Sequence, residues 1–560
     1  MKSIINRIYM LALGLCALIA TSCVKNADGL VDDPSSNRPF VPYSFSVKTS
    51  RDTAKFLWSA PVLSSGKRYN YTVDVSQDSL FSNVEFTKQV DTLGFNIIEP
   101  ILSVAKKYYA RLRVNSFKGS EPSQWYYSGS FTINGENYLR AIRDFEISPS
   151  TALIHWYANT NTAAVNKITV TKSDGSAGPS FDLTPGDAAN GAKTLVNLAP
   201  DTRYTLQLFS GSKSKGIMSF STTKTVIYTV ILPAGADLAA AINSAADGDV
   251  IGLSPGSYTL GNSIFTMTGK NITIRSVSNN PLDTKLKLRE IDIAGTNAGI
   301  TFAGLDIDGN YTGTSFGLVF LGLKGAPANG DPTNFADVRL DNCVIHDFTR
   351  CLVQANYATA ANGHTIKGFT INNCIIYNID KAGTSTYYTI SLEKLQFSAF
   401  NIAKSTFYNM GTGMFNIGTA INTSVVVPSV SIDYCTFNNF GSGNKYLLFD
   451  ANANKINYVM RNSILANSPL AGGSINAIAF RATGSGSTLN FLNNNYFQLN
   501  ASAGSAALNL TGLNNVAYNN INLGWTASTQ NFSLSTLPVD NKIFSSSTSG
   551  STVGDPRWAY

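Results

Sequence analysis

The sequence predicts an all-β protein that contains two β-sandwich modules followed by a parallel β-helix, and three observations lead to this prediction. Charged residues make up 14% of the 560 residues and hydrophobic residues 44%, which is typical of β-rich extracellular proteins rather than of charged helical enzymes. Short strands of alternating polarity fill the N-terminal half of the chain. Towards the C-terminus, one sequence motif recurs about every thirty residues, and no long helix is predicted between its copies. A repeat of this period indicates a solenoid.

The N-terminus has the pattern of a secretion signal. Lys2 and Arg7 precede the apolar run MLALGLCALIA, and small residues lead from it to Cys23. The apolar run is too short to remain across a bilayer. The ending ATSC resembles a bacterial lipobox, which implies that residues 1–23 are a lipoprotein signal peptide and that Cys23 carries the lipid after cleavage. We therefore expect an outer-membrane lipoprotein that faces the cell surface and contacts the membrane through its N-terminal lipid.

Residues 24–39 are polar and contain Pro, Ser and Gly, which is typical of a flexible tether. Asp28, Asp32 and Asp33 in this stretch weakly resemble the surface-export signal of lipoproteins from gut-type Gram-negative bacteria. Such a tether would hold the folded modules away from the membrane.

The net charge of +7 is unevenly distributed along the chain. Residues 1–225 contain 24 Lys and Arg against 17 Asp and Glu, whereas residues 226–560 contain 18 of each. The C-terminal region therefore gains no affinity for polyanions from its net charge. The sequence contains no phosphate-binding loop, dinucleotide fingerprint or nucleic-acid motif, and we expect no nucleic-acid partner.

Residues 40–135 and 136–225 each show short alternating strands separated by turn residues. Each stretch has a Trp in an early strand and a Tyr in a late strand, a pattern that favours two small β-sandwiches. The phrase LAPDTRY, which ends at Tyr204, resembles the corner between the late strands of fibronectin type III domains, and Tyr108 lies at the corresponding place in the first stretch. The resemblance implies two fibronectin III-like modules that serve as spacers or protein-binding units.

Residues 226–560 begin with an Ala-rich segment that predicts a short helix from Leu238 to Ala245, followed by a turn and a short strand. A helix at this point would cap the open end of a sheet. The whole phrase resembles the opening of right-handed parallel β-helices of the pectate-lyase superfamily, notably chondroitinase-B-like proteins. The residues that carry this resemblance are Ala241, Ile242, Ala245, Gly248, Asp249, Ile251, Leu253, Pro255, Gly256 and Tyr258. It implies a right-handed parallel β-helix with an N-terminal capping helix.

The repeats predict columns of equivalent side chains, because stacked coils advance by the strand spacing of roughly 4.8 Å. One column holds small side chains that can hydrogen-bond along the stack. Its members are Cys343, Cys374, Ser405, Cys435, Ser463 and Asn495, at steps of 31, 31, 30, 28 and 32 residues. A second column is apolar and is expected to form the core. Its members are Ile345, Ile376, Phe407, Phe437, Leu465 and Phe497.

The same columns bear on the turns and the cysteines. The Asn-rich turns are expected to suit tight corners, because Asn tolerates left-handed backbone geometry. Ser replaces Cys in the small column, so the position favours a small side chain over a Cys343–Cys374 disulfide, which is the alternative. No Cys-x-x-Cys pair is present, and we expect no metal site.

Residues 500–560 are rich in Ser, Asn and Thr, which predicts irregular final coils and a tail laid back on the body.

The flat outer faces of a β-helix suit an extended polymer. The architecture resembles β-helix lipoproteins of unknown function from glycan-harvesting systems. The resemblance implies binding of an acidic polysaccharide for glycan capture and utilisation, with other surface glycan-utilisation proteins as further partners. A polysaccharide lyase acting on uronic-acid glycans and a structural or adhesive surface protein are the alternatives.

The best candidate for glycan binding is the strand TKLKLREI. Lys285, Lys287 and Arg289 alternate with Leu286 and Leu288, so one strand face carries three cations. Such a ladder could hold the sulfates or carboxylates of an anionic glycan. The alternative is an exposed strand whose charges only keep the surface soluble.

A lyase would need a base and a cation that neutralises the substrate carboxylate. The resemblance points to Lys394 as the base, but the family has an acid about five residues before this Lys, and Tyr388 or Thr389 stands there in this chain. Arg350 and His346, in the polar phrase VIHDFTRC, are the other catalytic candidates. Calcium (Ca2+) is expected only if the chain is a lyase, and no other cofactor is expected.

A hydrolase would instead need two carboxylates on one face. Asp306 and Asp308 are two residues apart on a predicted strand, which places them on one side of it. The phrase Asp-Gly-Asn that begins at Asp308 is also a common turn, and the sequence favours the turn.

Overall fold

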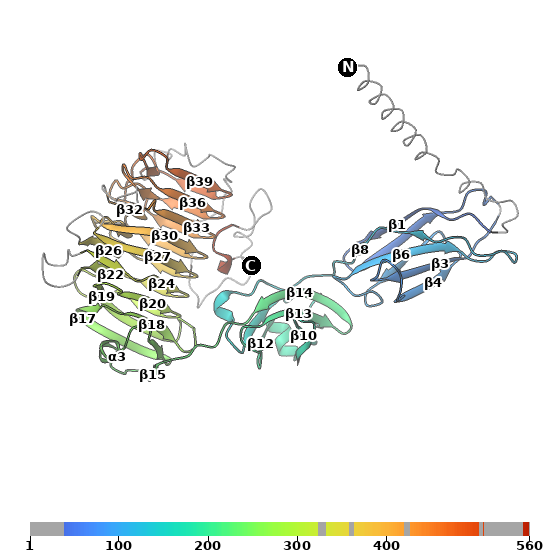
Figure 1. The fold of residues 1–560 in the computed structure, drawn as a ribbon, viewed down its shortest axis with the longest axis horizontal. Coiled ribbons are helices and arrows are strands. Elements are labelled where there is room, and N and C mark those ends of the chain that lie inside the picture. The colour runs from blue at the N-terminus through green and yellow to red at the C-terminus, as the bar shows by residue number, and fades with distance from the viewer. Residues whose placement is uncertain are drawn as a thin grey trace, which may run out of the picture.

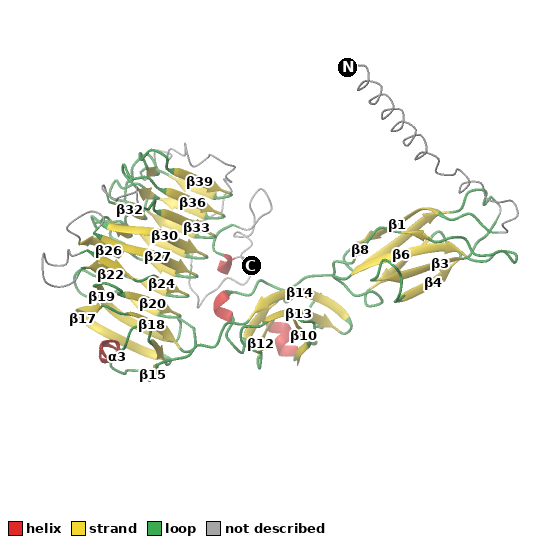
Figure 2. Cartoon of the chain, viewed as in Figure 1, coloured by secondary structure: helices red, strands yellow, loops and turns green. Residues whose placement is uncertain are grey.

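A computed structural model of the chain describes residues 38–65, 67–322, 332–357, 363–418, 426–502, 508, 532 and 553–558. The predicted signal peptide with Cys23 and nearly all of the predicted tether lie outside these residues. The chain is nearly all β and forms two sandwich modules followed by a long stack of coils (Figures 1 and 2). No helix within the described ranges is long and apolar enough to cross a membrane.

The first module is an antiparallel β-sandwich. One sheet contains β1 (Tyr43–Thr49), β2 (Thr53–Ser59) and β5 (Gly94–Ile98). The other sheet contains β4 (Phe86–Val90), β3 (Tyr71–Ser76), β6 (Lys107–Val114) and β7 (Tyr126–Tyr127), and β8 (Phe131–Thr132) also pairs with β6. The predicted early Trp is Trp58 on β2, which is buried in the core between the sheets.

The second module repeats this arrangement. One sheet contains β11 (Ala177–Asp182), β10 (Lys167–Lys172), β13 (Arg203–Ser210) and β14 (Lys213–Ser221), and the other pairs β12 (Ala192–Leu195) with β9 (Ala152–His155). Two short helices, η2 (Asp144–Glu146) and α2 (Pro185–Asn190), lie in its connections. Trp156, just after β9, is buried in the core of this module. His155 on β9 forms an ion pair with Glu146 at 2.8 Å, as a structural residue would.

The predicted tyrosine corners are confirmed in both modules. The hydroxyl of Tyr108 accepts a hydrogen bond from the backbone N–H of Ser103 at 3.0 Å. The hydroxyl of Tyr204 accepts one from the backbone N–H of Ala199 at 2.8 Å. In each case the ring is buried and its hydroxyl ties the corner to the strand, as in fibronectin III-like sandwiches.

The C-terminal region begins with the predicted cap. β15 (Val230–Leu232) pairs in parallel with β16 (Val250–Leu253), and α3 (Leu238–Ser244) lies between them in sequence. The Asp237 carboxylate caps the helix by accepting a hydrogen bond from the N–H of Ala240 at 2.9 Å. Leu238 and Ile242 are buried at the start of the coil core, so the predicted helix and its position are confirmed.

The coils form two parallel sheets. The first sheet runs through β15, β16, β18 (Asn271–Ser276), β20 (Gly299–Ala303), β24 (Val338–Asp341), β27 (His364–Asn372), β30 (Leu395–Ala403), β33 (Ser429–Asp433), β36 (Asn457–Arg461) and β39 (Thr488–Leu492), with β23 (Thr333–Phe335) beside β27. The second sheet has two arms that meet at β19 (Thr284–Ala294), which also pairs with β17 (Gly256–Thr268).

We call the two arms of the second sheet the first arm and the second arm. The first arm contains β21 (Asp306–Asp308), β25 (Val344–His346), β28 (Ile375–Tyr377), β31 (Thr406–Met410), β34 (Thr436–Phe440), β37 (Ile464–Ser468) and β40 (Asn495–Leu499). The second arm contains β22 (Phe316–Leu321), β26 (Cys351–Tyr357), β29 (Ile390–Leu392), β32 (Phe415–Ile417), β35 (Phe449–Asp450) and β38 (Phe480–Arg481). The six coils from β20 to β38 thus contribute one strand to the first sheet and one to each arm, and the predicted parallel β-helix is confirmed.

The apolar column is confirmed except in its last coil. Ile345, Ile376, Phe407, Phe437 and Leu465 are register partners in successive strands and all are buried. The next partner of Leu465 is Tyr496, not the predicted Phe497. The predicted last step was therefore one residue too long.

The hydrogen bonds of the small column explain why either Cys or Ser can occupy its positions. The backbone N–H of Cys343 donates to the Sγ of Cys374 at 3.4 Å, and the N–H of Cys374 donates to the Oγ of Ser405 at 3.0 Å. The same bond joins Cys435 to Ser463 at 3.1 Å. Each side chain accepts a hydrogen bond from the coil before it, and the four cysteines in the described residues are free rather than bridged.

The left-handed corners precede this column directly. Their members all have positive φ: Asn342, Asn373, Lys404, Tyr434, Asn462 and Asn493. Because Asn493 takes this place, Asn494 and not Asn495 continues the ladder, and its Oδ1 accepts from the N–H of Ser463 at 2.9 Å. This geometry is the physical reason for the one-residue correction above.

Candidate functional site

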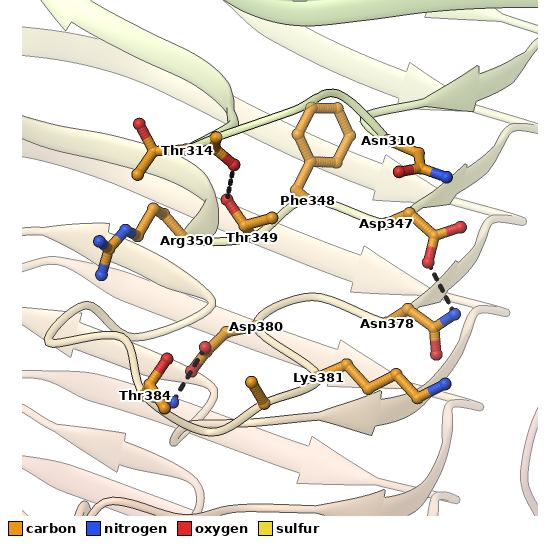
Figure 3. A pocket seen from close by; sticks show the side chains of 12 residues that line it. Asn310, Thr314, Asp347, Phe348, Thr349, Arg350, Asn378, Asp380, Lys381 and Thr384 are labelled. Atoms are coloured by element: carbon orange, nitrogen blue, oxygen red, sulfur yellow. Dashed lines mark hydrogen bonds between the residues drawn. The ribbon is translucent and has the colours of Figure 1, made fainter.

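A concave surface lies where the coils turn from the first arm to the second arm. The turns that follow β21, β25 and β28 line a pocket of about 670 Å³. Its lining residues are Asn310, Gly313, Thr314, Asp347, Phe348, Thr349, Arg350, Asn378, Asp380, Lys381, Ala382 and Thr384. We call it the corner pocket; its volume is in the range of pockets that bind small ligands, and most of the side chains that face it are polar (Figure 3).

Two cations line the corner pocket from neighbouring coils. Arg350 follows β25 and Lys381 follows β28, and Figure 3 shows them on separate turns. The backbone N–H of Arg350 donates to the carbonyl of Ser315 at 3.0 Å, which fixes the turn. Neither the guanidinium nor the ammonium group forms a hydrogen bond or an ion pair with another described residue. Both charges are therefore available to a ligand.

Asp380 fixes the loop that forms one side of this pocket. Its side chain is buried and accepts hydrogen bonds from the backbone N–H groups of Thr384 and Ser385, both at 3.1 Å. Burial raises the pKa of Asp380 above its ordinary value, although these hydrogen bonds and the charge of Arg350 act in the opposite direction. Asp380 thus shapes the loop that carries Lys381.

His346, a predicted catalytic residue, lies beside the corner pocket between two carboxylates. Its Nε2 is 2.9 Å from Oδ1 of Asp306, and its Nδ1 is 2.7 Å from Oδ2 of Asp347. Its ring stacks on Tyr377 of the next coil, with 4.9 Å between the ring centres. Burial alone would lower the pKa of His346, but the hydrogen bonds and charges of the two carboxylates outweigh it and raise the pKa above 6.5.

We expect the titration of His346, followed by NMR of the imidazole carbons, to have its midpoint above pH 6.5. Replacing Asp306 with Asn should lower the midpoint by roughly one pH unit, because a paired negative charge is removed. The pKa of His346 is raised in the folded protein. The contacts of His346 with the two carboxylates therefore add stability below pH 6.5, and this stability is lost as the pH rises through the folded pKa. Asp341→Asn is the control, and an unchanged midpoint in Asp306→Asn would contradict the assignment.

Asp308 takes the turn that the sequence favours. Its Oδ1 accepts a hydrogen bond from the backbone N–H of Asn310 at 2.7 Å. The same carboxylate lies 4.0 Å from the Nδ1 of His346 and 4.0 Å from the Nζ of Lys287. Asp306 and Asp308 are therefore engaged with His346 and a turn, which does not favour a hydrolase pair.

Asp308, His346 and Asp347 are also the group in the described residues whose ligand atoms could hold a metal ion, since these atoms lie within 4.8 Å of one another. The sequence itself predicts no metal site. Two carboxylates and one imidazole do not match the six to eight oxygen ligands that calcium prefers. The donor set therefore gives no support to a calcium-dependent lyase at this place.

The predicted cation ladder has the expected alternation but little free charge. Leu286 and Leu288 are buried in the core, and the three cations face outwards. Lys287 lies over the ring of Tyr311 at 4.8 Å and beside Asp308. The Nε of Arg289 donates to the backbone carbonyl of Thr314 at 3.0 Å. Lys285, opposite Asp306 in the register, is the exposed member.

Lys394 lies in a different place from the other two predicted catalytic residues. It follows β29 on the second arm and lines a smaller pocket of about 300 Å³ with Asp450 and Arg481. Arg481 forms two hydrogen bonds to the Asp450 carboxylate, at 2.6 and 2.7 Å. The corner pocket contains Arg350 and borders His346, but not Lys394. The structure thus brings together two of the three candidates.

Glu290 and Asp292, on β19, form a further acidic pair that the sequence did not indicate. Both are buried, and neither lines the corner pocket. Burial, followed by the hydrogen bond and charge of Asp292, raises the pKa of Glu290 to about 8. Glu290 in this pair therefore holds its proton more strongly than an isolated Glu does.

Lys381 was missed by sequence reasoning, although the repeat contains a signal for it. It stands 31 residues after Arg350, which is the step between successive coils. The same step relates Asp347 to Asn378, and the Nδ2 of Asn378 donates to the Oδ1 of Asp347 at 2.8 Å. Extending the columns to the turn residues would have placed both cations at one corner.

Comparisons with known proteins cover parts of the chain. A family model described as a domain of unknown function (DUF4957) matches residues 256–410, which include Arg350 and Lys381. No curated protein matches the chain significantly.

Three solved structures are similar to about a third of the chain. They are the FN1–FN3 domains of chicken CNTN1 (13% identity, 33% of this chain, 66% of that chain, TM-score 0.15), a segment of two fibronectin type III domains from chicken tenascin (14%, 32%, 97%, 0.16) and the central fibronectin III array of RIM-binding protein (17%, 34%, 72%, 0.13). The chain thus spans slightly less than two thirds of the CNTN1 fragment. These TM-scores are too low to carry an argument, and the sandwich architecture rests on the strands and cores described above.

Proposed function

We propose that the chain is a surface lipoprotein whose β-helix captures an acidic polysaccharide in the corner pocket. The observation that carries this proposal is that Arg350 and Lys381 line one pocket without an ion-pair partner among the described residues. Carboxylates or sulfates of a glycan would supply the counter-charges, and Arg binds such groups with two parallel hydrogen bonds. The Thr and Asn side chains around the pocket would bind sugar hydroxyls.

The corner pocket takes the place of the predicted ladder of Lys285, Lys287 and Arg289 as the binding site. Lys287 and Arg289 use their charged groups within the protein. The ladder is also paired in the register with Asp306 and Asp308 of the next coil. Lys285 remains as an exposed cation at the margin of the site.

Anchoring and family relationship are proposed from sequence resemblance. The lipobox supports an outer-membrane anchor at Cys23, and the two sandwich modules would hold the β-helix away from that membrane. The opening phrase of the β-helix supports a relationship to the pectate-lyase superfamily. Together these features fit glycan capture and utilisation beside other surface proteins.

The test is affinity electrophoresis of the chain lacking residues 1–23 in gels that contain polygalacturonate, alginate or chondroitin sulfate, with dextran as the neutral control. The native protein is expected to be retarded by one of the acidic glycans, and less so at high salt. Arg350→Ala with Lys381→Ala should weaken binding by at least about 100-fold, because each charged hydrogen bond contributes about 1.5–3 kcal/mol.

Lys367→Ala is the matched control, because Lys367 is an exposed cation on β27, in the other sheet. It should bind as the native protein does. Equal retardation of the double variant and the native protein would overturn the pocket assignment. Retardation by dextran alone would overturn the preference for an acidic glycan.

A second candidate function is a polysaccharide lyase. One observation favours it: Asp347 lines the corner pocket and also hydrogen-bonds His346, which places an acid–base group at the pocket margin. Incubation with the same glycans would reveal a lyase through the ultraviolet absorbance of its unsaturated uronate product. Product formation that His346→Gln abolishes would favour the lyase, whereas retention without product favours capture. Failure of both assays would leave a structural or adhesive role.

A further inference from the structure

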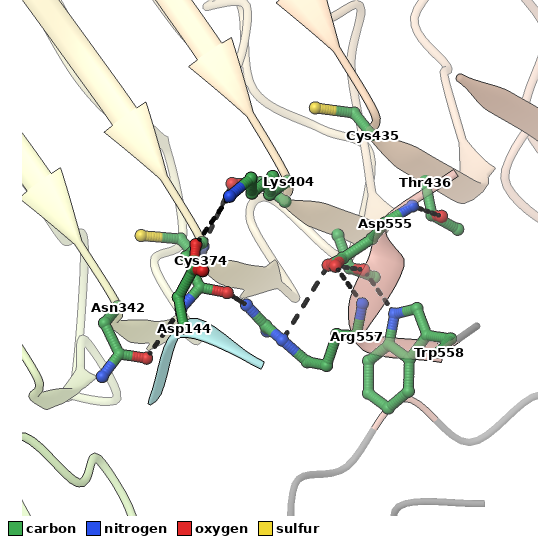
Figure 4. A network of polar contacts seen from close by, with 12 residues as sticks. Asp144, Asn342, Cys374, Lys404, Cys435, Thr436, Asp555, Arg557 and Trp558 are labelled. Atoms are coloured by element: carbon green, nitrogen blue, oxygen red, sulfur yellow. Dashed lines mark hydrogen bonds and ion pairs between the residues drawn. The ribbon is translucent and has the colours of Figure 1, made fainter. Parts of the chain in front are cut away.

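The last described residues of the chain, 553–558, lie against the outer face of the first arm. They follow Phe532 after a stretch outside the described residues, and they pack over β28, β31, β34 and β37. Figure 4 shows Asp555, Arg557 and Trp558 in a network of polar contacts with side chains of the β-helix. Asp555 and Trp558 are 0% exposed, and Arg557 is 3% exposed. We call this segment the C-terminal hexapeptide and the surface beneath it the tail groove.

The column of outward side chains beneath the hexapeptide is mostly aliphatic. It reads Val344, Ile375, Thr406, Thr436 and Ile464 in successive coils. Thus two threonines interrupt an otherwise aliphatic column. Both are fully buried, and an unused hydroxyl at such a place would be costly.

Both threonine hydroxyls are used by the hexapeptide. The Oγ1 of Thr406 donates to the Asp555 carboxylate at 2.8 Å and accepts from the indole Nε1 of Trp558 at 2.7 Å. The Oγ1 of Thr436 accepts from the backbone N–H of Asp555 at 2.9 Å. These partners are 119 to 152 residues apart in the sequence, so the contacts are purely tertiary.

Arg557 and Gly554 are matched to the groove as well. The Nη2 of Arg557 donates to the Oδ1 of Asn373 at 2.5 Å, and Asn373 is one of the left-handed corner residues. Gly554 has a φ of +81°, and a Cβ there would lie 2.6 Å from the Cδ1 of Ile464. The backbone N–H of Gly554 donates to the carbonyl of Asn462 at 2.8 Å. Glycine is therefore required by both conformation and space.

The apolar residues of the hexapeptide complete the fit. Val553 and Trp558 pack in one cluster with Phe532 and with side chains of the first arm. Those side chains are Ile375, Ile464, Ala466 and Phe497. Five of the six residues thus have a specific partner on the groove, and Pro556 begins the short helix η5 (Pro556–Trp558).

We propose that the tail groove is a sequence-specific peptide site whose ligand is the C-terminal hexapeptide of the same chain. The hydrogen bonds described above for Asp555, Arg557 and Trp558 end on side chains of the groove, so a peptide that contains residues 553–558 carries these recognition groups. A chain without its own hexapeptide therefore offers an open groove that binds the same peptide when it is added separately.

The test uses the chain lacking residues 1–23, with and without a further truncation of residues 553–560, and a fluorescent peptide with the sequence of residues 551–560. The truncated chain should bind the peptide saturably, and the untruncated chain should not, because its groove is occupied. Peptides with Asp555→Ala or Trp558→Ala should bind at least about tenfold more weakly. Pro556→Ala is the matched control, since the proline ring has no group that can hydrogen-bond to the groove.

A truncated chain with native circular dichroism that does not bind the peptide, or that binds a scrambled peptide equally well, would overturn the proposal. If truncation prevents folding, the untruncated chain provides the measurement by hydrogen–deuterium exchange. The amides of Gly554, Asp555, Arg557 and Trp558 should exchange slowly in the native chain and faster in Thr406→Val, while those of β18 and β20 stay unchanged. Fast exchange of these four amides in the native chain would equally overturn the proposal.

Discussion

Replacing Phe407 with Ala is expected to lower the free energy of unfolding of the β-helix by about 3–5 kcal/mol. Phe407 is fully buried in the apolar column, between Ile376 and Phe437. Its ring stacks on Phe437 with 5.0 Å between the ring centres. The coils on both sides are held by parallel backbone hydrogen bonds and cannot collapse into the space, so the variant keeps most of the cavity. Urea denaturation followed by circular dichroism measures the change.

Two variants make this measurement interpretable. Phe407→Leu keeps most of the volume and should cost less than Phe407→Ala. Ile264→Ala, on β17, removes an apolar side chain that is 49% exposed, and its effect should stay within about 0.5 kcal/mol. A Phe407→Ala chain as stable as the Ile264→Ala chain would show that this column is not the core.

Replacing Ser405 with Ala should lower the free energy of unfolding by about 1–3 kcal/mol, because it leaves a buried donor without an acceptor. The backbone N–H of Cys374 donates to the Oγ of Ser405, and this hydroxyl donates in turn to the carbonyl of Ala403 at 2.7 Å. Alanine fits the space but accepts no hydrogen bond. The same urea experiment gives the size of the loss.

Ser405→Cys is the matched control for this position. The coil before it shows that a Cys can serve, since the Sγ of Cys374 accepts from the N–H of Cys343 at 3.4 Å. The Cys variant should therefore be more stable than the Ala variant. Equal losses of unfolding free energy in the Ala and Cys variants would contradict this prediction. They would mean that the hydrogen bond accepted at position 405 does not stabilise the fold.

The register of the coils could be predicted almost completely from the sequence. Equivalent residues recur with a nearly constant step, and a parallel stack converts that step into columns. The prediction failed by one residue at Asn495, because Asn493, Asn494 and Asn495 are identical in type. Only the left-handed φ of Asn493 shows which of the three turns the corner.

The candidate site was predictable only to a degree. Arg350 and His346 were identified because polar residues crowd the phrase after one strand, and the structure places both at the corner pocket or its margin. Lys394 was identified from a family resemblance, and it lies at a different pocket. The free cation Lys381 was missed, since a Lys in a polar turn has no distinguishing local signal.

The sequence by itself determined the two sandwich modules, the capping helix at Leu238 and the columns of the β-helix, because each of these depends on local periodicity or on a fixed repeat. Only the tertiary structure decided which outward charged side chains remain without a partner among the described residues and which form a hydrogen bond or ion pair with a neighbour. Arg289 is bound by a carbonyl from the next coil, and His346 by Asp306, which lies 40 residues earlier. It also decided that the tail covers Thr406 and Thr436. Residues 553–558 contact strands that lie more than 100 positions earlier in the chain. Such contacts follow no sequence repeat, so only the folded structure shows them.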